Sequence, residues 1–200
     1  MGDPPDRSFS DAEEEILRAT YSALREHGYA DLTIKRIAEE YGKSTAAVHY
    51  HYDTKEELLA AFLDYILQRF VDTIHEVETT DPEQRLTLLL DQLLVELEDH
   101  LDLLVAILEM RSQAPYKEAF AERFAQNDEY VRYMLRTVIA DGIRQGVYDE
   151  DVDPEHAAGA LMTIVDGART RAVVLDDADA LATARRTAEE YVDSVLRVDD

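Results

Sequence analysis

The sequence predicts an all-α fold of about nine helices. Apolar residues recur at helical spacing along most of the chain, and no segment alternates apolar and polar residues as a half-buried strand does. Serine, threonine or aspartate precedes several of these segments, at the position of a helix N-cap. Glycine or proline stands at several of their ends. These patterns predict a small N-terminal head followed by a larger helical body.

The composition is that of a globular chain in a reducing compartment. Of the 200 residues, 46% are hydrophobic, which is ample for a packed core. No run approaches the roughly 18 apolar residues that cross a bilayer, and no basic-then-apolar leader precedes the first helix. The absence of cysteine excludes disulfides and thiolate metal sites. We therefore expect a cytoplasmic protein with no membrane partner.

The net charge is strongly negative. The 44 acidic and 20 basic residues give a formal charge of −24, the wrong sign for nonspecific attraction to nucleic acid. Abundant Asp and Glu with only four lysines are typical of halophilic proteins, because molar salt screens charge repulsion. Acidic disorder is the alternative, but the regular apolar spacing argues against it. We expect folding to weaken in dilute buffer.

The head covers residues 10–54 and follows residues 1–9, which have nothing to bury and are expected to be a flexible arm. Its first helix begins at Ser10, which has capping-box spacing to Glu13, and ends at Gly28. Apolar residues at helical spacing between these limits predict that one face of this helix packs into the head.

The stretch Thr33–Lys55 predicts a helix-turn-helix. Thr33 caps one short helix, Gly42 ends it in the left-handed conformation, and Ser44 caps a second helix that runs to about His51. The connection is three or four residues long, and such a unit places its second helix in the major groove of DNA. The segment 32–55 holds four basic and three acidic residues, including three of the four lysines. The residues themselves therefore indicate DNA binding.

The body, residues 55–200, is predicted to hold six further helices. Caps and proline or glycine breaks place them at about 55–77, 82–100, 101–113, 116–145, 154–175 and 180–197. Their apolar positions are dense enough for a central core. The helix at 154–175 is rich in alanine and glycine, so it can approach another helix closely.

Residues 10–65 resemble the N-terminal DNA-binding domain of the TetR family of repressors. The matching residues are Leu32-Thr33-Ile34, Tyr41-Gly42-Lys43-Ser44, Val48-His49-Tyr50-His51-Tyr52 and Lys55-Glu56-Glu57-Leu58. The body resembles the betaine-repressor type of C-terminal domain. The resemblance implies a ligand-responsive repressor that binds a palindromic double-stranded DNA operator as a homodimer, without a cofactor.

The resemblance also assigns roles within the helix-turn-helix. Thr33, His51 and Lys55 match phosphate-contacting positions, Tyr50 matches one that points at the bases, and His49 stands where the family usually has tyrosine. The complete set of expected DNA-binding residues is Thr33, Lys35, Arg36, Lys43, Ser44, Thr45, Ala46, Ala47, His49, Tyr50, His51 and Lys55.

Some of these positions have a structural alternative. Tyr50 is as easily explained by packing, and Lys35 and Arg36 by ordinary surface charge. His49 and His51 are two residues apart, so they point in different directions on a helix and do not suggest a metal site.

Body helices four to seven surround an effector cavity in the TetR family. An apolar cavity of this kind would be lined by Phe62, Ile66, Leu97, Leu104, Leu108, Phe120, Phe124, Tyr130, Met134 and Met162, although core packing explains each of them as well. Arg111, Lys117 and Arg123 form a rare basic cluster that suggests an anionic effector, with an acyl-CoA-like thioester first. The alternatives are ion pairs with Glu109, Glu118 and Glu122, and a cationic amphiphile sensed by an efflux regulator.

The last two helices form the dimer interface in the family. Apolar and small residues make matching stripes on them here: Ala157, Ala158, Ala160, Leu161, Ile164 and Gly167, with Ala188, Tyr191, Val192 and Val195. A two-fold dimer would place two recognition helices about one DNA turn apart.

Two other functions fit the sequence less well. An enzyme would need a convergent nucleophile, base or metal set, and we find no cysteine, no spaced His/Glu ligand motif and no glycine-rich phosphate loop. A helical interaction module without DNA binding explains the acidity, but it does not explain the lysines gathered in the helix-turn-helix.

Overall fold

The structure is a computed structural model that describes residues 9–95 and 100–197. Within these ranges it contains nine α-helices and no named strand, so the all-α prediction is confirmed. No helix there is long and apolar enough to cross a bilayer. The chain divides into two compact units: residues 1–72 with 102–128, and residues 73–101 with 129–200. Each unit is described by itself.

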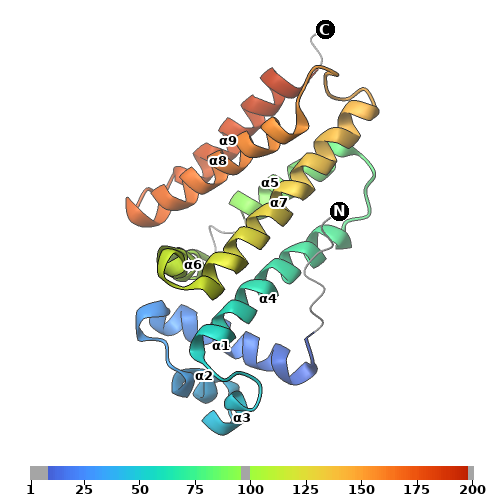
Figure 1. Cartoon of the computed structure of the whole chain (residues 1–200). Coiled ribbons are helices and arrows are strands. Elements are labelled where there is room, and N and C mark those ends of the chain that lie inside the picture. The colour runs from blue at the N-terminus through green and yellow to red at the C-terminus, as the bar shows by residue number, and fades with distance from the viewer. Residues whose placement is uncertain (1–8, 96–99, 198–200) are drawn as a thin grey trace. The chain divides into compact units, whose positions relative to one another are not determined.

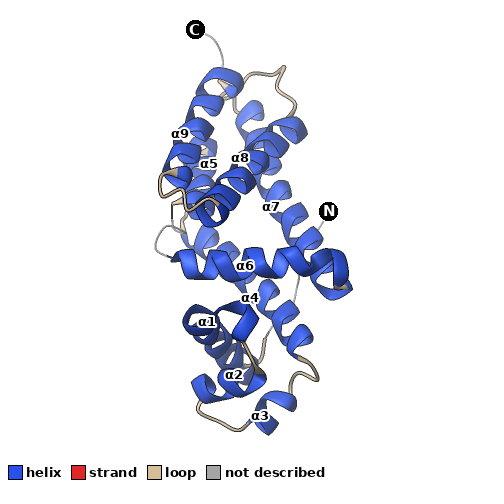
Figure 2. Cartoon of the chain, turned by 90° about the vertical axis from the view of Figure 1, so that its left-hand side faces the viewer, coloured by secondary structure: helices blue, strands red, loops and turns tan. Residues whose placement is uncertain are grey.

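The first unit contains the helix-turn-helix (Figure 1). Its helices are α1 (Asp11–Asp31), α2 (Ile34–Tyr41), α3 (Thr45–His49), most of α4 (Lys55–Glu76), most of α6 (Leu101–Gln113) and the start of α7 (Glu118–Arg144). The short 3₁₀ turn η2 (Ala114–Tyr116) joins α6 to α7. Figure 2 shows α6 lying beside α1.

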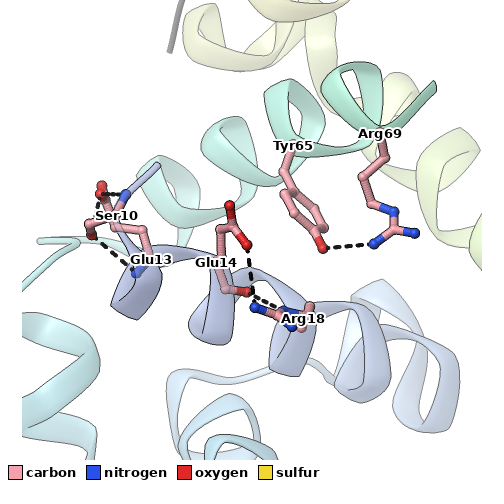
Figure 3. A network of polar contacts seen from close by, with 6 residues as sticks. All are labelled: Ser10, Glu13, Glu14, Arg18, Tyr65 and Arg69. Carbon is pink, nitrogen blue, oxygen red and sulfur yellow. Dashed lines mark hydrogen bonds and ion pairs between the residues drawn. The ribbon is translucent and has the colours of Figure 1, made fainter. Parts of the chain in front are cut away.

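Local capping explains why these helices begin and end where they do. Ser10 and Glu13 form the predicted capping box, in which each side chain accepts the other's backbone N–H at 3.4 and 3.0 Å (Figure 3). Thr33 caps α2 and Ser44 caps α3, each by accepting an amide N–H. Gly42 ends α2 with φ 70°, a conformation that glycine adopts without strain.

The core of the first unit joins the head to α6 and α7. Ile16, Val48 and Tyr52 are fully buried, and they belong to the same hydrophobic cluster as Met110 of α6 and Phe120 of α7. Val48 and Tyr52 are therefore core residues. The helix-turn-helix does not have a separate core, because side chains from α6 and α7 complete it.

The second unit contains α5 (Pro82–Leu94), the remainder of α7, α8 (Pro154–Val174) and α9 (Ala180–Tyr191). Asp81 and Asp153 cap α5 and α8, each with proline in the first turn. The helices α8 and α9 lie side by side (Figure 1). A five-residue π-helical turn, η3 (Val192–Leu196), follows α9.

Several helix limits differ from the predicted ones. The helix α5 ends at Leu94 and not at about residue 100, and α7 begins at Glu118 because residues 114–116 form the 3₁₀ turn η2. Gly28 breaks the helical geometry as predicted (φ 69°, ψ 172°), but the chain resumes a helical turn, so α1 continues past the kink to Asp31. The helix α3 ends at His49 and not at about His51, because the His51 amide bonds to the Val48 carbonyl three residues back and tightens the last turn. The helix α9 ends at Tyr191, where the chain widens into η3.

Candidate nucleic-acid interface

The exposed surface of α3 is the candidate interface. Val48 is buried on its inner face, whereas Thr45, Ala46, His49 and Tyr50 are exposed. Residues four apart lie above one another on a helix, so Thr45 pairs with His49 along one ridge and Ala46 with Tyr50 along the other. Tyr50 keeps 86% of its surface accessible, which excludes the packing alternative for this residue.

The aromatic side chains at the end of α3 are oriented by one another. The ring of Tyr50 lies edge to face on that of His51, with centroids 5.1 Å apart. Nδ1 of His49 lies 3.3 Å from the Tyr52 carbonyl oxygen. These contacts leave the Tyr50 hydroxyl end and the outer edge of His49 available to a ligand.

Lys43 is held near the start of α3 by residues of α1 and α2. Its Nζ donates to Tyr41 Oη at 2.9 Å and to Glu15 Oε2 at 3.2 Å. The hydrogen bond to Tyr41, and then that to Glu15, raise the pKa of Lys43. The Lys43 side chain is about half exposed, and exposed ion pairs of this kind are weak. Lys43 can therefore exchange Glu15 for a phosphate.

Lys55 has an internal role that the sequence does not predict. Its Nζ donates to the carbonyl oxygens of Tyr29 at 3.2 Å and Leu32 at 2.6 Å, and lies 4.9 Å from the centre of the Tyr29 ring. Burial, and then repulsion from Lys117, lower the pKa of Lys55. An ammonium has three protons, so one remains for the predicted phosphate contact.

The other predicted positions lie at the surface or partly exposed. Lys35 pairs with Glu39 of the same helix at 3.7 Å, and Arg36 donates to the Asp31 carbonyl at 2.5 Å. The hydroxyls of Thr33 and Ser44 serve as caps. None of the twelve predicted DNA-binding residues is buried, so each stays a candidate.

A pocket of about 410 Å³ lies beside Lys55 in the first unit. It is lined by Tyr29, Thr54, Lys55, Glu56, Leu59 and Lys117. The sequence gives no sign of it, because Lys117 pairs with a glutamate 61 positions earlier, Glu56. Glu109 is a second residue that sequence reasoning missed. Its Oε2 accepts the Tyr29 amide N–H at 3.2 Å and ties α6 to the end of α1.

The predicted basic cluster does not form a free anion site. Arg111 pairs with Asp128, Lys117 with Glu56, and Arg123 with the buried carboxylate of Asp64 at 3.4 Å. Ion pairing was the alternative for this cluster, but the expected neighbours Glu109, Glu118 and Glu122 were wrong. The partners come from elsewhere in the fold, because side-chain packing decides them and sequence proximity does not.

The predicted effector-lining residues divide between the two units. Phe62, Leu104, Phe120 and Phe124 are buried in the first unit, Arg111 packs over Phe124, and Leu97 lies outside the described residues. Tyr130, Met134 and Met162 belong to the second unit and are partly buried, as are Ile66 and Leu108 in the first. Three pockets of about 410, 350 and 220 Å³ in the described ranges have none of these residues in their walls. The effector set stays a prediction.

Burial narrows the predicted dimer surface. Ala157, Ala158, Leu161 and Ala188 are at most 1% exposed and pack inside the second unit, which contains α8 and α9. They cannot touch a second chain without opening that core. The predicted residues that retain exposed surface are Ala160, Ile164, Gly167, Tyr191, Val192 and Val195.

Two family descriptions match the chain. Residues 16–62 match the model described as "Bacterial regulatory proteins, tetR family". Residues 82–197, more than half of the chain, match "BetI-type transcriptional repressor, C-terminal".

The chain is also similar to individual transcription regulators. The chain is 71% identical to a TetR transcription regulator from Haloarcula marismortui, with a TM-score of 0.89 over 94% of this chain and 100% of that one. It is 27% identical to the transcriptional repressor AcnR of Corynebacterium efficiens over 83% of this chain and 82% of that protein. FadR of Bacillus subtilis, solved in complex with stearoyl-CoA, shares the fold with a TM-score of 0.71 and 19% identity, covering 90% of this chain and 97% of that one.

Proposed function

Because the chain belongs to the TetR family of transcriptional regulators, with a BetI-type C-terminal part, we propose that it is a ligand-responsive repressor that binds a palindromic operator as a homodimer. The observation that carries this proposal is the exposed face of α3, with Tyr50 and His49 projecting from a helix anchored by Val48. Helix N-termini at Thr33 and Ser44, and the ammonium groups of Lys43 and Lys55, supply contacts for phosphates beside the groove.

The DNA-binding part is tested by exchanging two exposed tyrosines. Tyr50 on α3 and Tyr116 in η2 are 86% and 84% exposed, so removing either ring leaves the core intact. A mobility-shift assay in molar KCl, with the upstream region of the chain's own gene as probe, compares the wild type with Tyr50→Ala and Tyr116→Ala. We expect Tyr50→Ala to weaken binding about tenfold, as loss of a groove contact does. Tyr116→Ala should bind like the wild type.

Equal binding by all three proteins would contradict the proposal that the exposed face of α3 contacts the duplex. Absence of any shift with the wild-type protein, tested over a panel of duplexes covering the gene's surroundings, would contradict DNA binding itself and favour the helical interaction module. Circular dichroism of each variant at the same salt concentration shows whether the fold is kept.

The proposed effector is a small hydrophobic molecule, with an acyl-CoA-like thioester as the first class to test. The shared fold of FadR, which binds stearoyl-CoA, supports this choice, but the ion pairs of Arg111, Lys117 and Arg123 weaken it. A cationic amphiphile is the second class, because a net charge of −24 attracts cations. Release of bound duplex by palmitoyl-CoA and not by tetraphenylphosphonium supports the first class, and the reverse supports the second.

Coupling between effector and DNA is proposed to pass through α6 and the start of α7. Glu109 holds the Tyr29 amide, Lys117 pairs with Glu56, and Met110 and Phe120 share the core of the helix-turn-helix. A ligand that prefers one position of α6 would therefore shift the arrangement of α1 and α4. If a ligand binds and leaves DNA affinity unchanged, this route is wrong.

A further inference from the structure

The orientation of His49 fixes the hydrogen-bonding character of its outer nitrogen. Nδ1 lies 3.3 Å from the Tyr52 carbonyl oxygen, and a carbonyl oxygen only accepts hydrogen bonds. Nδ1 must therefore carry the proton. In a neutral imidazole only one nitrogen is protonated, so Nε2 is left as an acceptor with a free lone pair. The reverse ring orientation would place a carbon against the carbonyl and lose this hydrogen bond.

The outer edge of this ring is directed to solvent and not to the core. His49 is exposed at the last position of α3, on the same ridge as Thr45, while Val48 beside it is buried. The only hydrogen bond described for its imidazole is the one that Nδ1 makes to Tyr52. An acceptor at this position needs a donor from the molecule that α3 binds.

We propose that Nε2 of His49 accepts a hydrogen bond from the exocyclic amino group of an adenine or cytosine in the major groove. This inference rests on the proposed function. In this neutral form of the ring a phosphate oxygen is not the partner, because two acceptors repel each other. In the major groove only adenine N6 and cytosine N4 are donors, whereas guanine and thymine present acceptors. His49 therefore selects an amino base over guanine or thymine at one position of each half-site.

The residues beside His49 do not themselves distinguish donor bases from acceptor bases, so this preference can be assigned to His49. Ala46 has no hydrogen-bonding group, and the Tyr50 hydroxyl both donates and accepts, so it does not distinguish donor from acceptor bases. Among the exposed residues at the C-terminal end of α3, His49 is the one whose described contacts leave it with a hydrogen-bond acceptor and no donor for a ligand. A hydrogen bond of this kind also persists in molar salt, where phosphate attraction is screened.

Selection from a randomised duplex pool tests the proposal. Wild type, His49→Phe, His49→Arg and the control His75→Phe are each used to enrich binding sequences in molar KCl at about pH 8.5, above the usual range of imidazole titration. His75 is an exposed histidine in the last turn of α4 and belongs to the second unit. We expect wild type and His75→Phe to enrich adenine or cytosine at one position per half-site. His49→Phe should lose that preference alone, and His49→Arg should replace it with guanine.

Removal of one amino group from the selected duplex then tests whether that group is the partner of His49. Purine in place of adenine, or 2-pyrimidinone in place of cytosine, removes only the amino group. We expect the wild type to lose about two- to tenfold in affinity, the range of one hydrogen bond, and His49→Phe to bind both duplexes equally. Long-range ¹H–¹⁵N correlation spectra of the histidines should show the proton of His49 on Nδ1.

Three results would overturn the inference. They are a guanine or thymine preference in the wild type, an amino-base preference that survives in His49→Phe, and a proton on Nε2. These outcomes leave the proposed function standing, because the protein still selects a duplex. Failure of wild type to enrich any sequence would contradict the proposed function instead.

Discussion

Gly142 illustrates how one residue fixes the packing of the second unit. It lies inside α7, where glycine weakens a helix, yet a methyl group built on it would stand 2.2 Å from Cδ2 of Tyr148. The Tyr148 ring is 1% exposed and cannot move aside. Burial raises the pKa of Tyr148 to about 12, with help from Glu83. Glycine at position 142 therefore weakens α7 but leaves open the space that the buried Tyr148 ring occupies.

Alanine substitution at two helical glycines tests this explanation. Gly142→Ala should lower the free energy of unfolding by about 1–3 kcal/mol, because the added methyl overpacks a closed core. Gly159→Ala in α8 is the matched control, since a methyl there meets nothing within 4 Å. It should gain about 0.5–1 kcal/mol from reduced backbone entropy. Denaturant titration in molar KCl measures both, and a Gly142→Ala protein as stable as the wild type would refute the packing role.

At the scale of helices, Lys55 fastens the start of α4 to the end of α1. Lys55→Met removes the ammonium from the carbonyls of Tyr29 and Leu32 while keeping the aliphatic stem. We expect it to lower the free energy of unfolding by about 1.5–3 kcal/mol, the range for hydrogen bonds to a charged group. Lys35→Met, which breaks only an exposed pair with Glu39, should change stability by less than about 0.5 kcal/mol.

The same unfolding experiment separates two roles of Lys55. If Lys55→Met weakens DNA binding without changing stability, the residue is a phosphate anchor alone, as the sequence predicts. If stability falls as well, the ammonium has the internal role that the structure shows.

Helices and caps were predictable from the sequence, but long-range side-chain partners were not. The caps at Ser10, Thr33 and Ser44 depend on residues within three positions, so local spacing determines them. The bond from Tyr29 to Glu109 joins residues 80 positions apart. Only the tertiary packing of α6 on the head brings them together.

Apolar stripes were an incomplete guide to the dimer surface. A stripe predicts that a helix face is covered, but it does not distinguish a helix of the same chain from one of a second chain. Ala157 and Ala188 are covered within the second unit, so their stripe reports the packing of α8 on α9. The exposed Gly167 and Val195 remain available to a partner.

At the scale of the whole molecule, acidity and DNA binding have to be reconciled. The chain carries a net charge of −24, and all four of its lysines lie in the first unit, which contains the helix-turn-helix. The related regulator at 71% identity comes from Haloarcula marismortui. In molar salt the release of counterions from DNA contributes little, so hydrogen bonds, apolar contacts and DNA shape must supply most of the affinity.

The salt dependence of DNA binding tests this account most directly. Fluorescence anisotropy of the duplex from the chain's own upstream region, titrated over about 0.5–3 M KCl, gives the slope of log affinity against log salt, and ethylation interference counts the phosphate contacts. We predict specific binding that persists in molar KCl, with a slope shallower than about −0.9 per phosphate contact. A slope of about −0.9 per phosphate contact would contradict this account of the affinity. Loss of specific binding in molar KCl would contradict it as well.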